Sequence, residues 1–442
     1  MKPSAPPSPR LSAVRGEIVH FLADPAADPR ALEHFADGVL IVRDGHVAEC
    51  GPAAALLPKL PAGTPLADHR GKLILPGFVD THVHYPQTDI IASHGEQLLE
   101  WLEKYTFPAE RRFADRAHAA EVAGFFCDEL LRNGTTTAAA FATVHAASVD
   151  ALFEAARARR MRMITGKVLM DRNCPDFLRD TAETGYAESK ALIERWHNRD
   201  RLLYAITPRF APTSTPAQMT LAGRLFNEHP GVFLQSHLAE NRAEVAWVAQ
   251  LYPQARSYLD VYARAGQLGT RAVFAHCIWL DDADRRHMAE TGAAMSFCPT
   301  SNLFLGSGLF DLRRARTLGV RVGLGTDVGG GTSFSMLQTM NEAYKVLQLG
   351  GQSLSAASAF HLATLGGAHS LYLDDRIGNL APGKEADFVV LDPRATPLLA
   401  RRSAACETLE ERLFVLMMLG DDRVVAATHV MGEVAWRRSG RR

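Results

Sequence analysis

Histidines and a carboxylate follow short apolar segments of this chain, at positions where buried strands would end. The segment Asp80-Thr81-His82-Val83-His84 places two histidines two residues apart. In an extended chain, residues i and i+2 point to the same face, so both imidazoles can share one metal ion. Other apolar segments end in Ser236-His237, Ala275-His276 and Thr326-Asp327. Together these positions predict a metal site assembled from distant parts of the sequence.

The residue types at these positions indicate a catalytic metal. Three or four nitrogen and oxygen ligands with an open position are typical of a catalytic site and not of a structural one. Imidazole and carboxylate ligands suit Zn²⁺ or Fe²⁺, and their types alone do not choose between the two ions. Such a metal lowers the pKa of a bound water from about 16 to about 7. The expected reaction is therefore metal-assisted hydrolysis at an electrophilic carbon.

Three of these side chains are candidates for moving protons near the metal. Asp327 can accept a hydrogen bond from the attacking water, and His276 can either bind the metal or hydrogen-bond the same water. Glu240 follows His237 in a His-x-x-Glu pattern. If the chain turns into a helix there, this spacing places the Glu240 carboxylate beside the metal, where it can transfer protons. A glutamate that only favours a helix N-terminus is the alternative.

Eight short apolar segments, each ending in a polar residue, alternate with segments of helical pattern. The eight are Leu73–Val79, Thr135–Phe141, Arg162–Leu169, Leu202–Thr207, Val232–Ser236, Ala272–Ala275, Ala293–Cys298 and Arg321–Thr326. The helical patterns include Asp115–Asn133, Val149–Arg160, Thr215–His229, Arg242–Ala265 and Asp281–Thr291. Apolar strands alternating with helices indicate a parallel sheet covered on both faces. Eight of them favour an α/β fold of the (β/α)8 TIM barrel type, whose active sites form at the carboxyl ends of the strands. A doubly wound sheet is the alternative.

The two ends of the chain have strand patterns of a different kind. Asp44-Gly45 separates two short apolar segments, as in a tight hairpin, and strand patterns also fill the last sixty residues. Either end alone has too few strands for a core. We therefore expect a small β-sandwich built from residues 1–75 and 384–442, with the barrel between them at 76–383. The proline-rich first 25 residues predict a frayed tail and no signal peptide.

Composition excludes several classes of protein. The 442 residues carry 48 Lys and Arg against 49 Asp and Glu, a net charge of −1. Binding to nucleic acid or to a membrane surface requires a basic excess, so we expect neither partner. The six cysteines form no C-x-x-C pair, and this favours a reducing, cytoplasmic location. The longest apolar run, Leu413–Leu419, is too short to span a bilayer; we interpret it as core, with a subunit interface as the alternative.

Two motifs resemble hallmarks of the amidohydrolase superfamily. They are Leu75–His84, which contains the His-x-His pair, and Gly378-Asn379-Leu380 leading to Gly383-Lys384-Glu385-Ala386-Asp387. Within that superfamily the chain resembles the guanine deaminases from about residue 35 to its end. The most specific segment is Glu100–Glu110, and the matching motifs are Pro208–Phe210, Ser236–Asn241, Gly325–Gly331 and Leu419–Arg423. The segment after Asp327 is richer in glycine than the family's pattern.

The resemblance assigns roles to individual positions. It implies that one zinc ion per chain is bound by His82, His84, His237 and Asp327. It implies that the catalytic residues are Glu240 as proton shuttle, Asp327 and His276, the last at or beside the metal. It implies that guanine is bound by Gln87, Arg209, Phe210, His237, Glu240 and Asp327. A homodimer is implied as well.

The chemistry of guanine agrees with these assignments. Arg209 can donate to the oxygen O6, Gln87 can offer a donor and an acceptor to a ring edge, and Phe210, with Trp101 or Phe107, can cover the ring. The expected activity is hydrolytic deamination of guanine to xanthine and ammonia. Alternatives are a related aminohydrolase acting on 8-oxoguanine or a triazine, and a non-enzymatic scaffold that keeps only the barrel.

Overall fold

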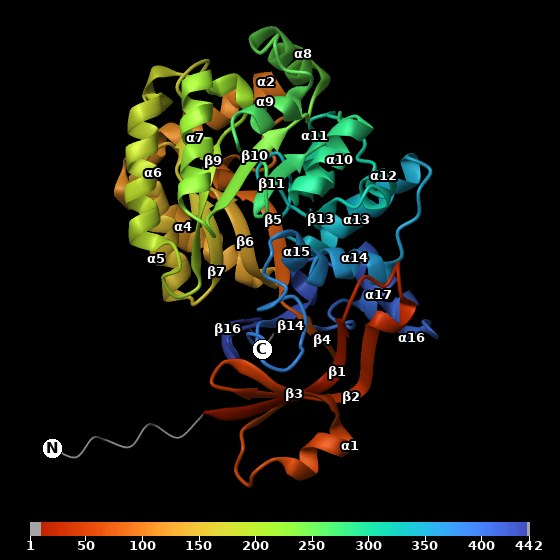
Figure 1. Cartoon of the computed structure of the whole chain (residues 1–442). Helices are drawn as coiled ribbons and strands as arrows, with labels where there is room; N and C mark the ends of the chain where they lie inside the picture. Colours follow the sequence, from red (N-terminus) through yellow and green to blue (C-terminus); the bar gives the residue numbers. More distant parts are fainter. Residues whose placement is uncertain (1–9, 440–442) are drawn as a thin grey trace, which may run out of the picture.

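A parallel barrel of eight long strands forms the centre of the computed structural model, which describes residues 10–439 (Figure 1). The strands are β5 (Phe78–His84), β6 (Thr135–Phe141), β7 (Arg162–Gly166), β9 (Leu202–Pro208), β10 (Phe233–Leu238), β11 (Ala272–His276), β12 (Ala294–Phe297) and β13 (Arg321–Leu324). A two-residue strand, β8 (Val168–Leu169), also pairs with β9. Almost every residue of these strands is buried, as expected for a sheet covered on both faces. The predicted TIM barrel is confirmed.

The barrel closes through the carboxyl ends of its first and last strands. The Asp327 N–H donates to the His82 carbonyl at 2.9 Å, and the His84 N–H donates to the Val328 carbonyl at 2.9 Å. The Thr81 hydroxyl donates to the Leu324 carbonyl at 2.9 Å. The candidate metal ligands therefore lie on the closing seam of the barrel.

The first predicted strand, Leu73–Val79, is wrong as a single element. Its first half belongs to β4 (Leu66–Pro76) of the other sheet, and its second half begins β5 of the barrel. Gly77 separates the two strands, so the apolar run continues while the chain passes from one sheet to the other. Because β5 extends to His84, the His-x-His pair lies on the strand itself.

Helices cover the outside of the barrel (Figure 1). They include α4 (Arg116–Arg132), α5 (Ala146–Ala158), α6 (Ala182–Trp196), α7 (Pro216–Glu228), α10 (Asp282–Thr291), α12 (Leu312–Thr317), α13 (Met336–Leu349), α14 (Ala356–Leu362) and α15 (Leu365–Ser370). The single helix predicted over Arg242–Ala265 is wrong. The segment forms α8 (Arg242–Leu251) and α9 (Tyr258–Arg264), because Pro253 interrupts it and Ser257 caps the second helix.

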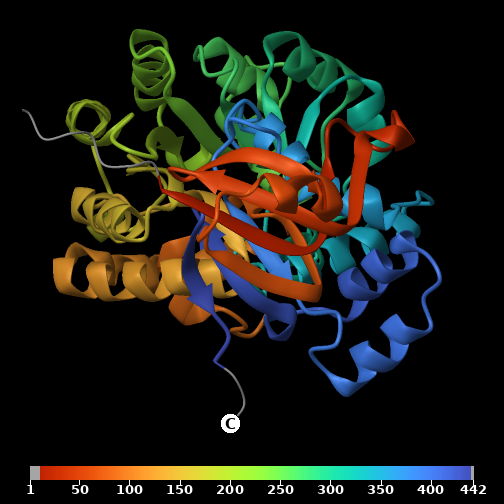
Figure 2. The same cartoon turned by 90° about the horizontal axis from the view of Figure 1, so that it is seen from below.

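Strands from both ends of the chain form a second, seven-stranded sheet across one end of the barrel (Figure 2). Its order is β16 (Glu433–Arg437), β15 (Val425–Val430), β14 (Phe388–Leu391), β4, β1 (Leu11–Phe21), β2 (Leu32–Arg43) and β3 (His46–Pro52). The β-domain expected from both ends is confirmed, and its strands form one continuous sheet because β4 pairs with β14 on one side and β1 on the other. The division at 75/76 and 383/384 remains a proposal.

Several predictions about single segments are decided by the structure. β1 begins at Leu11, so the frayed tail predicted for the first 25 residues is wrong from that point; residues 1–9 lie outside the described part. The apolar run 413–419 lies in α17 (Leu409–Leu419), where Leu413, Leu416 and Met417 are buried core residues. Within residues 10–439, no helix combines the length and apolar character needed to cross a bilayer.

A buried ionic cluster joins the barrel to the terminal sheet. Arg162 begins β7 and Arg201 precedes β9, and both donate to the carboxylate of Glu385. The Arg201 guanidinium also contacts Asp387, which accepts a hydrogen bond from the Met431 N–H at 2.9 Å. Both arginines are buried, so the two carboxylates offset the cost of removing two guanidinium groups from water.

We predict that Glu385→Gln destabilises the fold without altering the distant barrel mouth. The isosteric change leaves two buried arginines short of one counter-charge, which costs roughly 3–5 kcal/mol of unfolding free energy. Urea denaturation followed by circular dichroism measures this loss. Asp200→Asn is the control, because it breaks the exposed Arg157–Asp200 pair and should cost less than about 1 kcal/mol. Equal losses in both variants would contradict the role of the cluster.

Candidate active site

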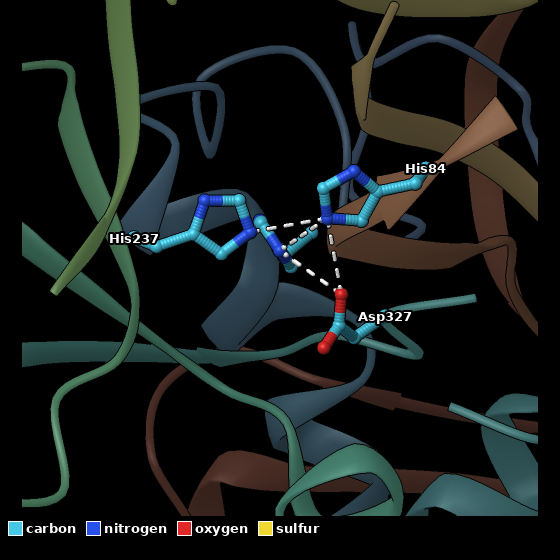
Figure 3. A group of neighbouring side chains, drawn as sticks. His84, His237 and Asp327 are labelled. Carbon is cyan, nitrogen blue, oxygen red and sulfur yellow. Dashed lines mark hydrogen bonds and ion pairs between the residues drawn. The ribbon is translucent and has the colours of Figure 1, made fainter. Parts of the chain in front are cut away.

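Three imidazoles and one carboxylate converge at the carboxyl ends of the barrel strands (Figure 3). His82 and His84 come from β5, His237 from β10, and Asp327 follows β13. The His84 Nε2 lies 3.2 Å from His82 Nε2 and 3.1 Å from His237 Nε2. Asp327 Oδ1 lies 3.2 Å from both His82 Nε2 and His84 Nε2. The structure thus brings together the four residues that the sequence indicated as metal ligands.

The protonation of His237 shows what these atoms can bind. Its Nδ1 lies 2.7 Å from the Arg209 carbonyl oxygen, which can only accept, so Nδ1 carries the proton and Nε2 has a free lone pair. Burial, together with the neighbouring histidines, lowers the pKa of His237 well below its usual value. Burial also lowers the pKa of His84 to about 3. A neutral imidazole whose Nε2 lone pair faces the other donors is suited to bind a metal cation.

The spacing of the four donors fits a transition metal such as zinc. Zinc–nitrogen bonds of about 2.0–2.1 Å in a tetrahedral arrangement place neighbouring donors about 3.3 Å apart. The observed separations of 3.1 and 3.2 Å are close to this value. His₃Asp is also a donor set that both Zn²⁺ and Fe²⁺ accept. The residues present therefore fit a divalent metal.

His276, at the end of β11, lies beside these donors. Its Nδ1 is 2.8 Å from the Asn302 amide oxygen, so Nδ1 donates there and Nε2 faces the site. That Nε2 lies 3.3 Å from Glu240 Oε2 and 3.7 Å from Asp327 Oδ2. The imidazole is thus placed between the two carboxylates that the sequence marked for proton transfer.

Glu240 reaches the site through a turn and not on a helix. The helical i, i+3 spacing expected after His237 is wrong, because α8 begins only at Arg242. Instead Ala239 adopts a positive φ of 50°, which reverses the chain. Burial, and to a lesser extent Asp327, raises the pKa of Glu240 to about 8. A carboxyl group that gains and loses its proton near neutral pH is suited to proton transfer.

Backbone strain gathers around the same strand ends. Ala239, His276, Cys277 and Asp327 all have positive φ values, of 50°, 70°, 52° and 51°. Side chains other than glycine rarely adopt this conformation. It persists where surrounding contacts fix it, commonly at functional sites.

A pocket lined mostly by buried residues opens beside the candidate metal ligands. It is lined by His84, Gln87, Leu98, Trp101, Leu102, Arg209, Phe210, His237, Glu240, Glu244, His276, Leu305, Asp327 and Gly330. Gln87 lies in the turn Tyr85–Ile90 after β5, and its Oε1 accepts a hydrogen bond from the Gly329 N–H at 3.2 Å. Trp101 ends α2 (Leu98–Trp101). The three residues predicted to recognise the substrate, Gln87, Arg209 and Phe210, thus share one pocket with three of the four candidate metal ligands.

An ion pair that the sequence did not reveal holds Arg209. Its Nη1 lies 2.8 and 2.9 Å from the two oxygens of Glu110, and both side chains are buried. The guanidinium carbon also lies 5.5 Å from the centre of the Phe107 ring. Phe107 therefore supports Arg209. Trp101 is the aromatic residue of the segment Glu100–Glu110 that lines the pocket. Glu110 lies in the segment Glu100–Glu110. The resemblance of this segment to the family was the one signal in the sequence that marked Glu110 as a functional residue.

Three other polar residues that support the site were not predicted. Asn302 orients His276, Ser307 donates to Glu240 Oε1 at 2.9 Å, and Glu244 accepts from the Glu240 N–H at 2.9 Å. Each lies in a segment whose pattern gives no chemical signal. Their contacts depend on which loops the barrel brings together.

Residues 73–435 match the Amidohydrolase family. The chain belongs to the amidohydrolase family. This amidohydrolase is 55% identical to the guanine deaminase of Escherichia coli (strain K12) over 97% of this chain and 98% of that protein. A solved structure of E. coli guanine deaminase superposes with a TM-score of 0.95, covering 97% of this chain and 100% of that one. Guanine deaminase from C. acetobutylicum, solved with guanine bound in the active site, is 30% identical over 96% of this chain and 99% of that one, with a TM-score of 0.87.

We predict that this amidohydrolase loses its metal when one converging imidazole is removed. His237→Ala should reduce the divalent metal in purified protein well below one equivalent, because it removes one of the four converging donors and leaves only two imidazoles and one carboxylate to hold the ion. Elemental analysis by mass spectrometry measures the content. His369→Ala is the control, since that histidine is half exposed and pairs only with Asp374. Full metal content in the His237 variant would contradict the site.

Proposed function

We propose that this chain catalyses the hydrolytic deamination of guanine, giving xanthine and ammonia, with one zinc ion per chain. The observation that carries the proposal is the pocket that brings metal-type donors and Glu240 together with Gln87 and Arg209. Three of the four donors line it: His84, His237 and Asp327. The identity of 55% to the E. coli guanine deaminase, over nearly the full length of both chains, supports the same activity. The guanine in the active site of the C. acetobutylicum relative supports the substrate.

The polar groups of the pocket match the edges of guanine. Arg209 donates to the carbonyl oxygen O6, and Gln87 offers a donor and an acceptor to a ring edge. Phe210 and Trp101 supply apolar surface for the ring. Adenine has an amino group where guanine has O6, which would face the Arg209 donors. Such a buried mismatch discriminates by about 10⁴ or more.

Zinc held by His82, His84, His237 and Asp327 would supply Lewis acidity that makes the attacking water more acidic. Glu240 takes a proton from that water as its oxygen bonds to C2 of guanine, and delivers the proton to N3. The carbon becomes tetrahedral and bears both oxygen and the amine. Asp327 and Glu240 then transfer a proton from the oxygen to the amine, which leaves as ammonia. The remaining purine is xanthine, so one water is consumed and one ammonia released.

His276 orients the attacking water in this proposal. Its Nε2 faces the Glu240 and Asp327 carboxylates, and its Nδ1 is held by Asn302. An imidazole fixed on one side can hydrogen-bond a water on the other side.

We also propose that the enzyme is a cytoplasmic homodimer. The six cysteines are free, which suits a reducing compartment. The resemblance to the guanine deaminases supports the dimer, and the exposed Leu303 and Leu419 would contribute apolar surface to its interface. Light scattering coupled to size-exclusion chromatography measures the mass, and a monomer at micromolar concentration would contradict the dimer.

We predict that Glu240→Ala lowers kcat for guanine by about 10²–10⁴-fold, because the proton-transfer group is lost. The metal content should stay unchanged, since Glu240 is not among the four converging donors. Xanthine formation followed by ultraviolet absorbance and ammonia release measure kcat. Glu194→Ala, on the exposed face of α6, is the control with wild-type turnover. Near-normal turnover of the Glu240 variant would reject the assignment.

We predict that Arg209→Lys raises KM for guanine more than it lowers kcat. Lysine keeps the positive charge beside Glu110. Its ammonium group lacks the rigid fork of donors with which the guanidinium can bind the Glu110 carboxylate and the guanine carbonyl together. The kinetics should be compared across guanine, 8-oxoguanine, adenine and a chlorinated triazine. Higher kcat/KM for 8-oxoguanine or the triazine than for guanine in the wild-type enzyme would instead favour the related aminohydrolase.

A further inference from the structure

Glu244 is a buried carboxylate in the active-site pocket that the proposed mechanism does not use. It is fully buried and lines the pocket beside Glu240. Its Oε2 accepts from the Glu240 N–H at 2.9 Å and the Asn241 N–H at 3.1 Å, and its Oε1 accepts from the Tyr258 hydroxyl at 2.7 Å. None of the ion pairs within residues 10–439 includes Glu244. Burying a carboxylate whose hydrogen-bond donors are all neutral costs free energy.

The two amides that Glu244 binds belong to the turn that carries Glu240. Ala239, in the middle of this turn, has a φ of 50°, which is a strained conformation for alanine. Its carbonyl accepts from the Ile278 N–H at 3.1 Å and the Trp279 N–H at 3.0 Å. The turn is therefore held from both sides: the loop after β11 binds the carbonyl of Ala239, and Glu244 binds the next two amides.

The side chain of Glu240 is held less firmly than its backbone. Ser307 donates to Oε1 at 2.9 Å, while Oε2 faces His276 Nε2 at 3.3 Å. Ser307 lies on a loop and His276 at the end of β11, both outside the turn, so the backbone of the turn sets where the carboxylate can reach. A displacement of about 1 Å in a reacting group can reduce the rate roughly 10²-fold.

We propose that Glu244 is a positioning residue, which holds the Glu240 turn in the geometry required for proton transfer to the substrate. The proposal rests on the proposed function, in which Glu240 moves the protons. Glu244 itself touches no reacting atom. Its effect on turnover passes through Glu240.

A second helix of this chain provides a matched control for ordinary capping. Glu244 also completes the capping box of α8 with Asn241, as Glu411 does for α17 with Thr408. Glu411 Oε2 accepts from the Glu407 N–H at 2.7 Å and the Thr408 N–H at 3.2 Å, the same pair of backbone positions. Because Glu411 is exposed and distant in sequence from the site, its removal reports the effect of losing a cap alone.

The test compares Glu244→Ala, Glu244→Gln and Glu411→Ala in the wild-type and Glu240→Ala backgrounds. In the wild-type background, Glu244→Ala should lower kcat about 10²-fold, with KM and zinc content changed by less than about twofold. Glu244→Gln should recover only about tenfold of that loss, because its amide oxygen still accepts from both N–H groups but, being neutral, binds them more weakly than the carboxylate does. Glu411→Ala should keep wild-type kcat. In the Glu240→Ala background, Glu244→Ala should change kcat less than about twofold, since the group it positions is gone.

Three results would overturn the proposal: wild-type kcat in Glu244→Ala, the same fold loss in both backgrounds, or an equal loss in Glu411→Ala. If Glu244→Ala gives no cooperative thermal transition, Glu244→Gln decides. A kcat loss of about threefold or more that disappears in the Glu240→Ala background supports the proposal, and any other pattern overturns it. Each comparison is a ratio to wild-type turnover, measured on the best substrate of the panel. A failure of the positioning role can therefore be told apart from a failure of the proposed function. That function fails if the wild-type enzyme releases no ammonia from guanine.

Discussion

The structure depends on holding three imidazoles and a carboxylate around one point in a buried place. Burial removes the water that would otherwise solvate and separate four such polar groups. They must therefore be fixed from behind. Asp327 N–H bonds the His82 carbonyl, His84 N–H bonds the Val328 carbonyl, and the ring of His237 is held by the Arg209 carbonyl. The bonds that close the barrel are thus the same bonds that place the metal ligands.

The same burial sets the charges of the pocket around this centre. Glu240 and Glu244 both lie in low-dielectric surroundings, and burial raises their pKa values to about 8 and about 7. Arg209 is equally buried, but Glu110 supplies its counter-charge. The pocket therefore keeps one permanent cation that is already paired, and carboxyl groups near the point of proton exchange. This arrangement suits a neutral, planar substrate that needs protons moved, and it agrees with a net charge of the whole chain near zero.

Sequence reasoning located the donors but not their supports. His82, His84, His237 and Asp327 are recognisable because strand ends are marked by apolar runs, and a barrel brings all strand ends to one face. Glu110, Asn302 and Ser307 lie in loops or short helices, where no periodicity indicates which residue faces the site. The turn at Ala239 was missed for the same reason: a positive φ on an alanine contradicts local preference and is held by contacts from the loop after β11 and from Glu244. The break at Pro253 was predictable from that proline, but the apolar pattern on both sides of it led to the prediction of one continuous helix.

The passage between the two sheets explains why the motif Leu75–His84 is so compact. β4 ends at Pro76 and β5 begins at Phe78, so one residue connects the terminal sheet to the barrel. A Cβ at Gly77 would lie 2.2 Å from the Thr136 hydroxyl, hence only glycine fits the crossing. Three residues later, the Asp80 carboxylate accepts from the Thr326 N–H at 3.0 Å, which fixes β5 against the strand end that carries Asp327. Within ten residues the chain ends one sheet, crosses at a glycine, secures the barrel seam and presents two metal ligands. Because the ionic cluster of Arg162, Arg201, Glu385 and Asp387 joins the two sheets at the opposite end of the barrel, the stability of that junction can change without moving the ligands.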